Sequence, residues 1–504
     1  MPDVTQTLDL AALGHAPCDA PALLRADGGA DGGTVRYGQL MRLVSAAQRL
    51  LEWPAKALVA VDAPRTLTGV VAYLAALRSG HAVMLVEDGS ADLWADLIAT
   101  YQPELLVTPP GSDLAKLAER TGFCGPAGGT LPTWRQADGR GSAGTIHPDL
   151  AMLMRTSGSL GRPKTVRLSF GNVRANAVAI AEALSIRPAD RALTSLPLDF
   201  SFGLSILNSH LAAGAATGLT SAAPSSEELW WCADQMRVTC VGAVPVTYQF
   251  LRASHWEPRE HPSLRRLLHS GGALDKTSLL HFARLMRRAG GDLFTMYGQT
   301  EATARIAYLP PELLTERLGS VGVAVPGGLI QIQRTDGTAA GDGEVGEVVY
   351  EGPSVMMGYA LARADLGAGD SQRGVLHTGD LGSLREGFLY LVGRADRQVK
   401  VLGRRVDLEQ VELLLASRGV TAAVTADTGE RLLVVVQSAA QRHAAVQCRA
   451  IAARLGVSRA AMTVVGMGAI PRSPRGKIDY SALSHALEQG IRNRPATIAD
   501  MRSP

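Results

Sequence analysis

The sequence predicts an α/β protein with a large N-terminal domain of α/β sheets, a β-rich subdomain and a small C-terminal α+β domain. A chain of 504 residues is too long for a single ordinary core, so more than one domain is expected. Strand-like and helix-like segments alternate from residue 150 to 310, as they do in a largely parallel sheet. After Gly319 the pattern changes to short strands and turns, and it changes again after Arg394.

The first part of the chain follows a βαβ pattern. Apolar residues in 35–50 recur at helical spacing. Leu58–Val61 and Val83–Val86 are short apolar runs that predict buried strands, and Leu67–Arg78 between them predicts a helix. The segment 111–148 is rich in Gly, Ser, Pro and Thr, so we expect a loop-heavy connection there.

The middle of the chain continues the alternation. Ala151–Met154 and Ala192–Leu196 predict strands, and Asn172–Leu184 predicts the helix between them. In the β-rich part we expect short strands at Gly328–Gln333, Gly346–Glu351 and Phe388–Val392.

The C-terminal unit combines helix-like and strand-like segments. Asp407–Ser417 and Arg442–Leu455 have helical spacing, and Val424–Gln437 predicts a hairpin that turns on Asp427-Thr428-Gly429. The final residues, 492–504, are polar and contain proline, so a frayed tail is expected.

The composition indicates a globular protein and excludes several classes. Apolar residues make up 46 % and charged residues 19 % of the chain. A net charge of +3 gives no support for nucleic acid or an anionic membrane as a partner. No apolar run reaches the roughly 18–20 residues of a membrane span, and no signal peptide is recognised, so no integral membrane segment and a cytoplasmic location are expected. Five cysteines without a Cys-x-x-Cys pair agree with a reducing compartment.

A glycine-rich run closed by a lysine is the first candidate site. Thr156–Lys164 reads Thr-Ser-Gly-Ser-Leu-Gly-Arg-Pro-Lys, in which free backbone N–H groups and one cation can surround a polyphosphate. It is not a Walker A loop, since Pro163 stands where that pattern needs glycine. The candidate phosphate-binding residues are Thr156, Ser157, Gly158, Ser159, Gly161 and Lys164.

A second glycine motif is a decoy. Gly341–Gly346 matches Gly-x-Gly-x-x-Gly, but a strand-like segment follows it where a dinucleotide-binding loop requires a helix. We therefore reject a dinucleotide site.

Five further motifs follow the phosphate loop in order. They are His269–Ala273 (His-Ser-Gly-Gly-Ala), Tyr297–Glu301 (Tyr-Gly-Gln-Thr-Glu), His377–Asp380 (His-Thr-Gly-Asp), Gly393–Arg397 (Gly-Arg-Ala-Asp-Arg) and Pro471–Asp479, which contains Lys477. Together the six motifs resemble the acyl-adenylate-forming superfamily, which includes acyl-CoA synthetases, firefly-type luciferases and nonribosomal adenylation domains. The resemblance covers about residues 35–480. It implies that a carboxylate attacks the α-phosphorus of ATP and that pyrophosphate leaves.

The resemblance also implies the domain organisation and the roles of single residues. Residues 1–394 correspond to the large AMP-binding domain, 395–397 to a hinge that contains Asp396, and 398–504 to a small mobile lid domain. Lys477 would bridge the substrate carboxylate and the α-phosphate. Tyr297 would stack on adenine, Thr300 would bond the α-phosphate, and Glu301 would hold Mg²⁺. The ribose would be bound by Asp380 and Arg394, and the adenine and acyl loops would include Gly271, Gly272, Ala273, Gly298 and Gln299.

The resemblance further implies a thioester as the product. In the family the small domain rotates about its hinge, and a loop matching Gly403, Arg404 and Arg405 then lies beside a tunnel for the pantetheine thiol of CoA. Aromatic and aliphatic residues indicate a mainly apolar acyl pocket, so a hydrophobic carboxylic acid is the expected small-molecule substrate. The candidate pocket residues are Phe200, Phe202, Gly203, Val244 and Pro245.

Three alternatives stay open from the sequence. The acyl group can pass to a carrier protein or a separate partner in place of CoA. Asp199 lies in the region where amino-acid-activating relatives hold an α-amino group, although a turn or capping role also explains it. A regulator that binds adenylate without turnover is a third reading, against which the presence of Lys477, Glu301 and Asp380 counts.

Overall fold

The structure is a computed structural model of the chain. It describes residues 9–10, 15–26, 33–62, 65–87, 89–125, 131–137, 145–156, 164–223, 226–401, 404–426, 431–455, 457–472 and 478–490. Ser157, Gly158, Ser159, Gly161, Gly403 and Lys477 lie outside these residues.

An eight-stranded sheet forms one half of the large unit. Its strand order is β19-β9-β8-β4-β3-β5-β7-β6, in which the central β8, β4, β3 and β5 are parallel and the outer pairs are antiparallel. The bounds are β3 Leu58–Asp62, β4 Ala82–Val86, β5 Leu105–Val107, β6 Phe123–Cys124, β7 Thr133–Gln136, β8 Leu150–Arg155, β9 Thr165–Ser169 and β19 Gly358–Ala360, with helices α3 Leu67–Arg78, α4 Ala91–Tyr101 and α5 Asp113–Arg120.

A nine-stranded sheet forms the other half. Its order is β16-β15-β14-β13-β12-β10-β11-β1-β2, with a parallel centre and antiparallel strands at both edges. Its strands are β1 Pro21–Arg25, β2 Val35–Arg36, β10 Arg191–Leu193, β11 Ala216–Leu219, β12 Cys240–Ala243, β13 Arg266–His269, β14 Asp292–Tyr297, β15 Ala307–Leu309 and β16 Val323–Ala324. The helices are α2 Tyr37–Leu50, α6 Phe170–Ala183, α7 Ser201–Ala212, α8 Glu227–Gln235, α9 Pro245–Ala253 and α10 Lys276–Arg288.

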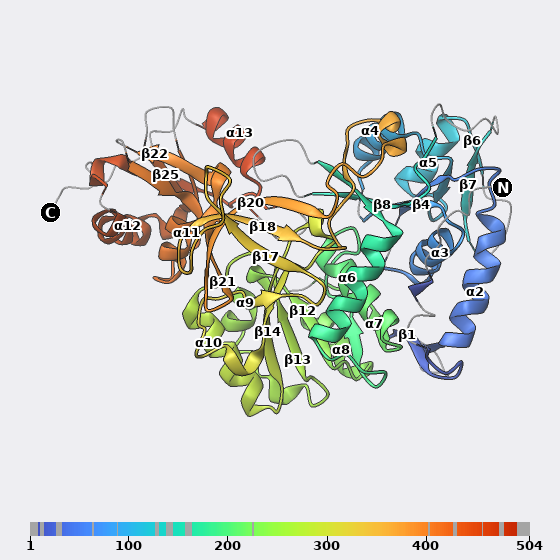
Figure 1. Cartoon of the computed structure of the whole chain (residues 1–504), viewed down its shortest axis with the longest axis horizontal. Coiled ribbons are helices and arrows are strands. Elements are labelled where there is room, and N and C mark those ends of the chain that lie inside the picture. Colours follow the sequence, from blue (N-terminus) through green and yellow to red (C-terminus); the bar gives the residue numbers. More distant parts are fainter. Residues whose placement is uncertain are drawn as a thin grey trace.

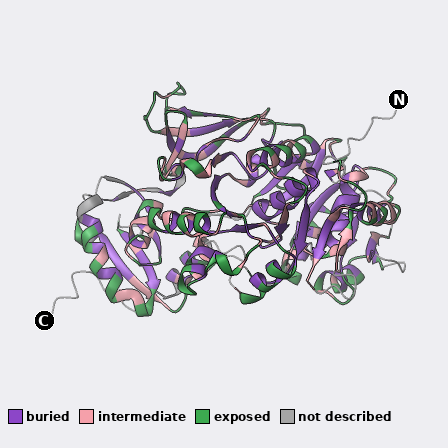
Figure 2. Ribbon diagram, turned by 90° about the horizontal axis from the view of Figure 1, so that it is seen from below, coloured by how far each residue is buried: buried purple, intermediate pink, exposed green. Residues whose placement is uncertain are grey.

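Helices α6 and α7 lie between the two large sheets (Figure 1). One face of this pair packs with the strands of the eight-stranded sheet, and the other face packs with β10, β12, β13 and β14. The strands of both sheets are mostly buried (Figure 2). The apolar composition of α7, in which every residue is buried, follows from this double contact.

The β-rich part and the C-terminal unit follow. The antiparallel sheet β17-β18-β20-β21 consists of Leu329–Gln333, Gly346–Glu351, Val375–Arg385 and Phe388–Arg394. The C-terminal unit has its own apolar core and contains β22 Gln398–Val401, β23 Arg404–Asp407, α11 Leu408–Ala416, β24 Ala422–Ala426, β25 Leu432–Gln437, α12 Gln441–Leu455, β26 Met462–Met467 and α13 Tyr480–Gly490. Short 3₁₀ helices are η1 Pro258–Glu260, η2 Thr300–Ala302, η3 Pro311–Leu313, η4 Arg363–Gly367, η5 Ala395–Arg397, η6 Ser438–Ala440 and η7 Arg459–Ala461.

The predicted fold class is confirmed, and one segment was predicted wrongly. The segment 111–148 is not only a connection, because it contains α5 and the edge strands β6 and β7. Ser112 caps α5 by accepting a hydrogen bond from the Ala115 N–H, and the Leu114 side chain lies on the buried face of this helix. Among the described helices, none combines the length and the hydropathy that a membrane crossing requires.

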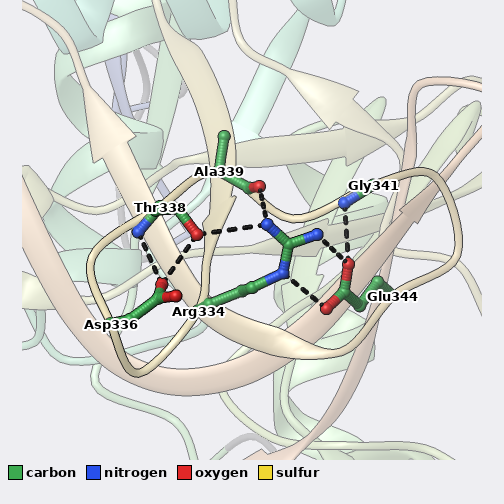
Figure 3. A network of polar contacts seen from close by, with 6 residues as sticks. All are labelled: Arg334, Asp336, Thr338, Ala339, Gly341 and Glu344. Carbon is green, nitrogen blue, oxygen red and sulfur yellow. Dashed lines mark hydrogen bonds and ion pairs between the residues drawn. The ribbon is translucent and has the colours of Figure 1, made fainter.

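The Gly341–Gly346 motif lies in a hairpin that leads into β18, so the rejection of a dinucleotide loop stands. Arg334 binds Glu344 through two hydrogen bonds of 2.7 and 2.6 Å, and the Gly341 N–H donates to the same carboxylate (Figure 3). Arg334 also donates to Thr338 and Ala339. This network is exposed and closes a surface turn.

Candidate active site

The register of β20 and β21 brings the two predicted ribose-binding residues together. Asp380 on β20 pairs with Arg394 on β21, and the Arg394 Nη1 lies 3.4 Å from the Asp380 Oδ1. Tyr297, at the end of β14, donates a short hydrogen bond from its hydroxyl to the Asp380 Oδ2. Burial and the Asp380 carboxylate raise the pKa of Tyr297, so its hydroxyl keeps its proton and donates. Three residues from three strands therefore form one polar cluster.

The Tyr297–Glu301 motif makes a tight turn from β14 into η2. A Cβ at Gly298 would lie 1.8 Å from the Ala304 backbone oxygen, so only glycine fits there. Gln299 donates to the Thr378 backbone oxygen over 3.4 Å, next to Asp380. Thr300 is buried, and its hydroxyl lies 3.3 Å from the Ser201 hydroxyl at the start of α7. The turn thus joins the ribose cluster to α7.

On the predicted phosphate side of the site lies Tyr359, which the sequence analysis did not identify. Two hydrogen bonds join Thr156 and Lys164, which flank the phosphate loop. The Thr156 N–H donates to the Lys164 backbone oxygen over 2.8 Å, and the Lys164 N–H donates to the Thr156 hydroxyl over 3.1 Å. The Lys164 ammonium lies 4.8 Å from the centre of the Tyr359 ring. The Tyr359 hydroxyl donates to the Glu301 Oε1 over 2.9 Å. Tyr359 therefore connects the phosphate-loop lysine with the predicted metal ligand.

Tyr359 reaches this place because β19 pairs with β9, directly after the phosphate loop. Tyr359 faces Val166 in that antiparallel register. In the sequence, only the run Met356-Met357-Gly358-Tyr359 after β18 could have indicated it, and no spacing rule links that run to Glu301.

The residues predicted for the acyl pocket contact the glycine loop after β13. Gly271 has a positive φ of +83°, and a Cβ there would lie 3.1 Å from Val244 and 3.4 Å from Phe200. A Cβ at Gly272 would lie 3.1 Å from the Pro245 ring. Ala273 continues this loop towards α10. The loop therefore borders Phe200, Val244 and Pro245, three of the residues predicted for the acyl pocket.

Helix α7 and its N-cap residue carry the two aromatic residues predicted for the acyl pocket. Phe200 and Phe202 make an edge-to-face pair with centroids 6.1 Å apart. Gly203 sits against the preceding chain, since a Cβ there would lie 2.2 Å from the Pro197 backbone oxygen. Asp199 lies close enough to the Arg65–Glu87 ion pair to affect the Glu87 carboxylate.

The change from the large unit to the C-terminal unit falls between Arg394 and Arg397. Arg394 lies beside Asp380, whereas Arg397 binds Glu412 and the Tyr480 hydroxyl in the C-terminal unit. Asp396 is in η5 between them, and its side chain is not described. Arg404 and Arg405 begin β23, paired with β22, and their side chains are also not described.

The site fits a Mg²⁺ ion that shares ligands with phosphate. The described residues contain no cluster of three or more His, Cys, Asp or Glu side chains that could hold a metal by themselves. Glu301 is the carboxylate at the phosphate side, with the Thr300 hydroxyl next to it. One carboxylate combined with phosphate oxygens and water is a usual donor set for Mg²⁺ in nucleotide sites.

Comparisons with known proteins agree with this geometry. A family model described as AMP-binding enzyme matches residues 11–360. The chain is 32 % identical over 353 residues to the 2-succinylbenzoate–CoA ligase of Bacillus velezensis, covering 67 % of this chain and 70 % of that enzyme. It is 31 % identical over 266 residues to a feruloyl-CoA synthase of Amycolatopsis, covering 52 % of this chain and 53 % of that protein.

A solved structure shares the whole architecture. The o-succinylbenzoate CoA synthetase of Bacillus subtilis, in complex with its acyl-adenylate intermediate, superposes with a TM-score of 0.74 at 25 % identity, covering 95 % of this chain and 98 % of that one. The predicted resemblance is therefore confirmed, and the chain belongs to the AMP-binding enzyme family.

Proposed function

We propose that the protein is an acid–thiol ligase, which activates a carboxylic acid with ATP to an acyl-adenylate, releases pyrophosphate and transfers the acyl group to CoA. The observation that carries the proposal is the pair of polar clusters on either side of Thr300. Tyr297, Asp380 and Arg394 form one cluster, and Lys164, Tyr359 and Glu301 form the other. A nucleotide needs both clusters. The first offers a carboxylate that can accept hydrogen bonds from the ribose, and the second offers a lysine and a carboxylate for Mg²⁺, which can neutralise the phosphates.

Different residues bind the ribose, the phosphates and the carboxylate during adenylate formation. Asp380 accepts hydrogen bonds from the ribose hydroxyls, and Arg394 steadies that carboxylate. Lys164 neutralises the leaving pyrophosphate, and the Thr300 hydroxyl donates to the α-phosphate. A bound Mg²⁺ supplies charge neutralisation at the phosphates, with Glu301 as its protein ligand. Lys477 from the C-terminal loop brings a further positive charge to the attacking carboxylate, which lowers the barrier by electrostatic stabilisation.

The second step needs the C-terminal unit to move. We propose residues 1–394 as the AMP-binding domain, 395–397 as the hinge and 398–504 as the lid. The two flanking side chains support a hinge at Asp396, since that of Arg394 lies beside Asp380 of the large unit and that of Arg397 binds Glu412 of the C-terminal unit. Gly403, Arg404 and Arg405 are the proposed contacts of CoA.

The proposal also covers the class of acid, the acyl acceptor and the cellular location of the protein. Both curated relatives are named for CoA esters of aryl acids, and Phe200, Phe202 and Val244 are buried apolar residues that suit such a group. CoA stands in both names, so we propose CoA and not a carrier protein as the acceptor. The five cysteines are free thiols, which supports the expected cytoplasmic location.

ATP–pyrophosphate exchange with a panel of aliphatic, aryl and amino acids tests the first step. We expect acid-dependent exchange that is lost in Asp380→Asn and Glu301→Gln and kept in Asp336→Asn, a carboxylate of the surface hairpin. Adding CoA should then give acyl-CoA and AMP. Exchange without thioester formation would refute the CoA half of the proposal, and no exchange with any acid would refute the whole.

A further inference from the structure

Arg305 is a buried cation without an acceptor. It follows the Tyr297–Glu301 turn by four residues and is 0 % exposed. Its Nε, Nη1 and Nη2 atoms have no hydrogen-bond partner among the described residues. The guanidinium lies over the Phe202 ring, whose centre is 4.0 Å from the guanidinium carbon. Such an arginine is unusual, because burial of an unpaired charge is costly.

The other buried arginines in the described part of the chain all have acceptors. Arg167 donates to the backbone oxygens of Met357, Tyr359, Ala368 and Gly369. Arg363 pairs with Glu104, and Arg397 pairs with Glu412. Arg305 therefore differs from these three buried arginines in having no hydrogen-bond acceptor among the described residues.

Among the residues that the structure describes, no neighbour supplies a negative charge to Arg305. Cys240 is the one ionisable side chain that interacts with it, and burial raises the pKa of that thiol to about 12, so the thiol is neutral. Burial lowers the pKa of Arg305 to about 9, which still leaves it charged at neutral pH. The aromatic face of Phe202 compensates for part of the lost hydration but offers no hydrogen-bond acceptor.

The position of Arg305 relates it to the acyl pocket. Gly271 borders Phe200, Phe200 contacts Phe202, and Phe202 covers Arg305, so these contacts lead from the glycine loop after β13 to the guanidinium. The guanidinium thus lies beyond the two phenylalanines that are predicted for the acyl pocket. A purely hydrocarbon acyl group would leave that cation without an acceptor.

We propose that Arg305 is a specificity-determining residue, which binds a second carboxylate at the end of the acyl group opposite the one that is adenylated. The inference rests on the proposed function, since it assigns the substrate class of the same site. The preferred acid is then a dicarboxylic acid with an apolar centre, which lies along Phe200 and Phe202. A guanidinium suits this role because it can hold a carboxylate through two parallel hydrogen bonds.

Matched acids test the inference. ATP–pyrophosphate exchange is measured with a dicarboxylic acid, its monomethyl ester and the monocarboxylic acid of equal length. For the wild type we expect kcat/KM for the diacid to exceed that for the other two by at least about tenfold. Arg305→Met keeps the length and apolar character of the side chain, and should reverse the preference. Arg305→Lys should keep part of it, and Arg334→Met, in the surface hairpin, should leave it unchanged.

Two results would overturn the inference. One is a wild type that does not distinguish the acids. The other is an Arg305→Met enzyme that loses activity equally with all three, which would make Arg305 a structural residue.

Thermal stability gives a readout that does not depend on turnover. Since Arg305→Met removes an unpaired buried charge, the variant without ligand should melt no lower than the wild type. The diacid should raise the melting temperature of the wild type and not that of the variant. If no acid supports exchange, this selective shift still supports the inference while the proposed function fails. An absent shift in the wild type, or a variant that melts lower, overturns the inference.

Discussion

Replacing Tyr359 by phenylalanine tests whether this residue supports the phosphate side of the site. The change removes the hydroxyl that donates to the Glu301 Oε1 over 2.9 Å. It keeps the ring that faces the Lys164 ammonium. The substitution therefore separates the orientation of the carboxylate from the placement of the lysine.

The expected loss follows from one hydrogen bond to a charged acceptor. Such a bond contributes about 1.5–3 kcal/mol when the groups are shielded from water. Tyr359 is 36 % exposed, so the lower end of that range applies. A loss of about 1.4 kcal/mol of transition-state stabilisation would slow adenylate formation roughly tenfold.

Rapid-quench measurement of acyl-adenylate formation over a Mg²⁺ titration checks this value. We expect a slower rate at saturating Mg²⁺ and a higher Mg²⁺ requirement, because Glu301 is no longer held in place. Tyr390→Phe is the matched control, since Tyr390 lies on β21, where the Arg385 guanidinium packs over its ring. A Tyr359→Phe enzyme with an unchanged rate, or with a lower Mg²⁺ requirement, would refute the reasoning, the latter because the hydroxyl would then compete with the metal.

Three further predictions concern the C-terminal unit. Asp396→Pro would fix φ near −65°, so one half-reaction should survive far better than overall turnover; unchanged overall turnover would show that Asp396 is not the hinge. Arg397→Ala removes the cation that pairs with Glu412, which keeps hydrogen bonds from the Tyr480 hydroxyl and the Val424 N–H, and it should cost about 3 kcal/mol of unfolding free energy in a denaturant titration. A loss below about 1 kcal/mol would contradict a structural ion pair. Burial, with Glu412 nearby, raises the pKa of Glu409 from 4.5 to about 7, so the folded state holds this proton more tightly than the unfolded state. The contribution of Glu409 to the free energy of unfolding should therefore be fully present below about pH 4.5 and fall by about 3 kcal/mol as the pH rises to 7. A Glu409→Gln protein that keeps this pH dependence would exclude Glu409 as its source.

The elements that were predicted correctly are those whose capping residues and apolar spacing match the face that they bury. Leu67–Arg78 is helical over the predicted bounds because Thr66 caps its start and its apolar residues are buried in a core shared with β3, β4 and α7. The segment 111–148 was predicted wrongly because its many small and polar residues hide a short amphipathic helix. Only three buried residues of α5, Leu114, Ala115 and Ala118, carry the signal for it.

The motifs predicted single site residues well, but not how they pair. Asp380 and Arg394 are predicted separately, while their contact depends on the register of two strands. Tyr359 lies 58 residues after Glu301, and only the pairing of β19 with β9 brings it to the phosphate loop. Arg305 stands in an apolar stretch, so its burial and its lack of an acceptor emerge only from the packing of α7 against the nine-stranded sheet.

A single-turnover experiment tests the central claim, that one site makes an acyl-adenylate and then a thioester. The enzyme is mixed with ATP, Mg²⁺ and an acid that supports exchange, and CoA is added after the first phase. We predict that acyl-AMP and pyrophosphate form in equal amounts without CoA, and that acyl-AMP converts to acyl-CoA and AMP once CoA is present. Formation of ADP and phosphate, or acyl-CoA without a preceding acyl-AMP, would contradict the account.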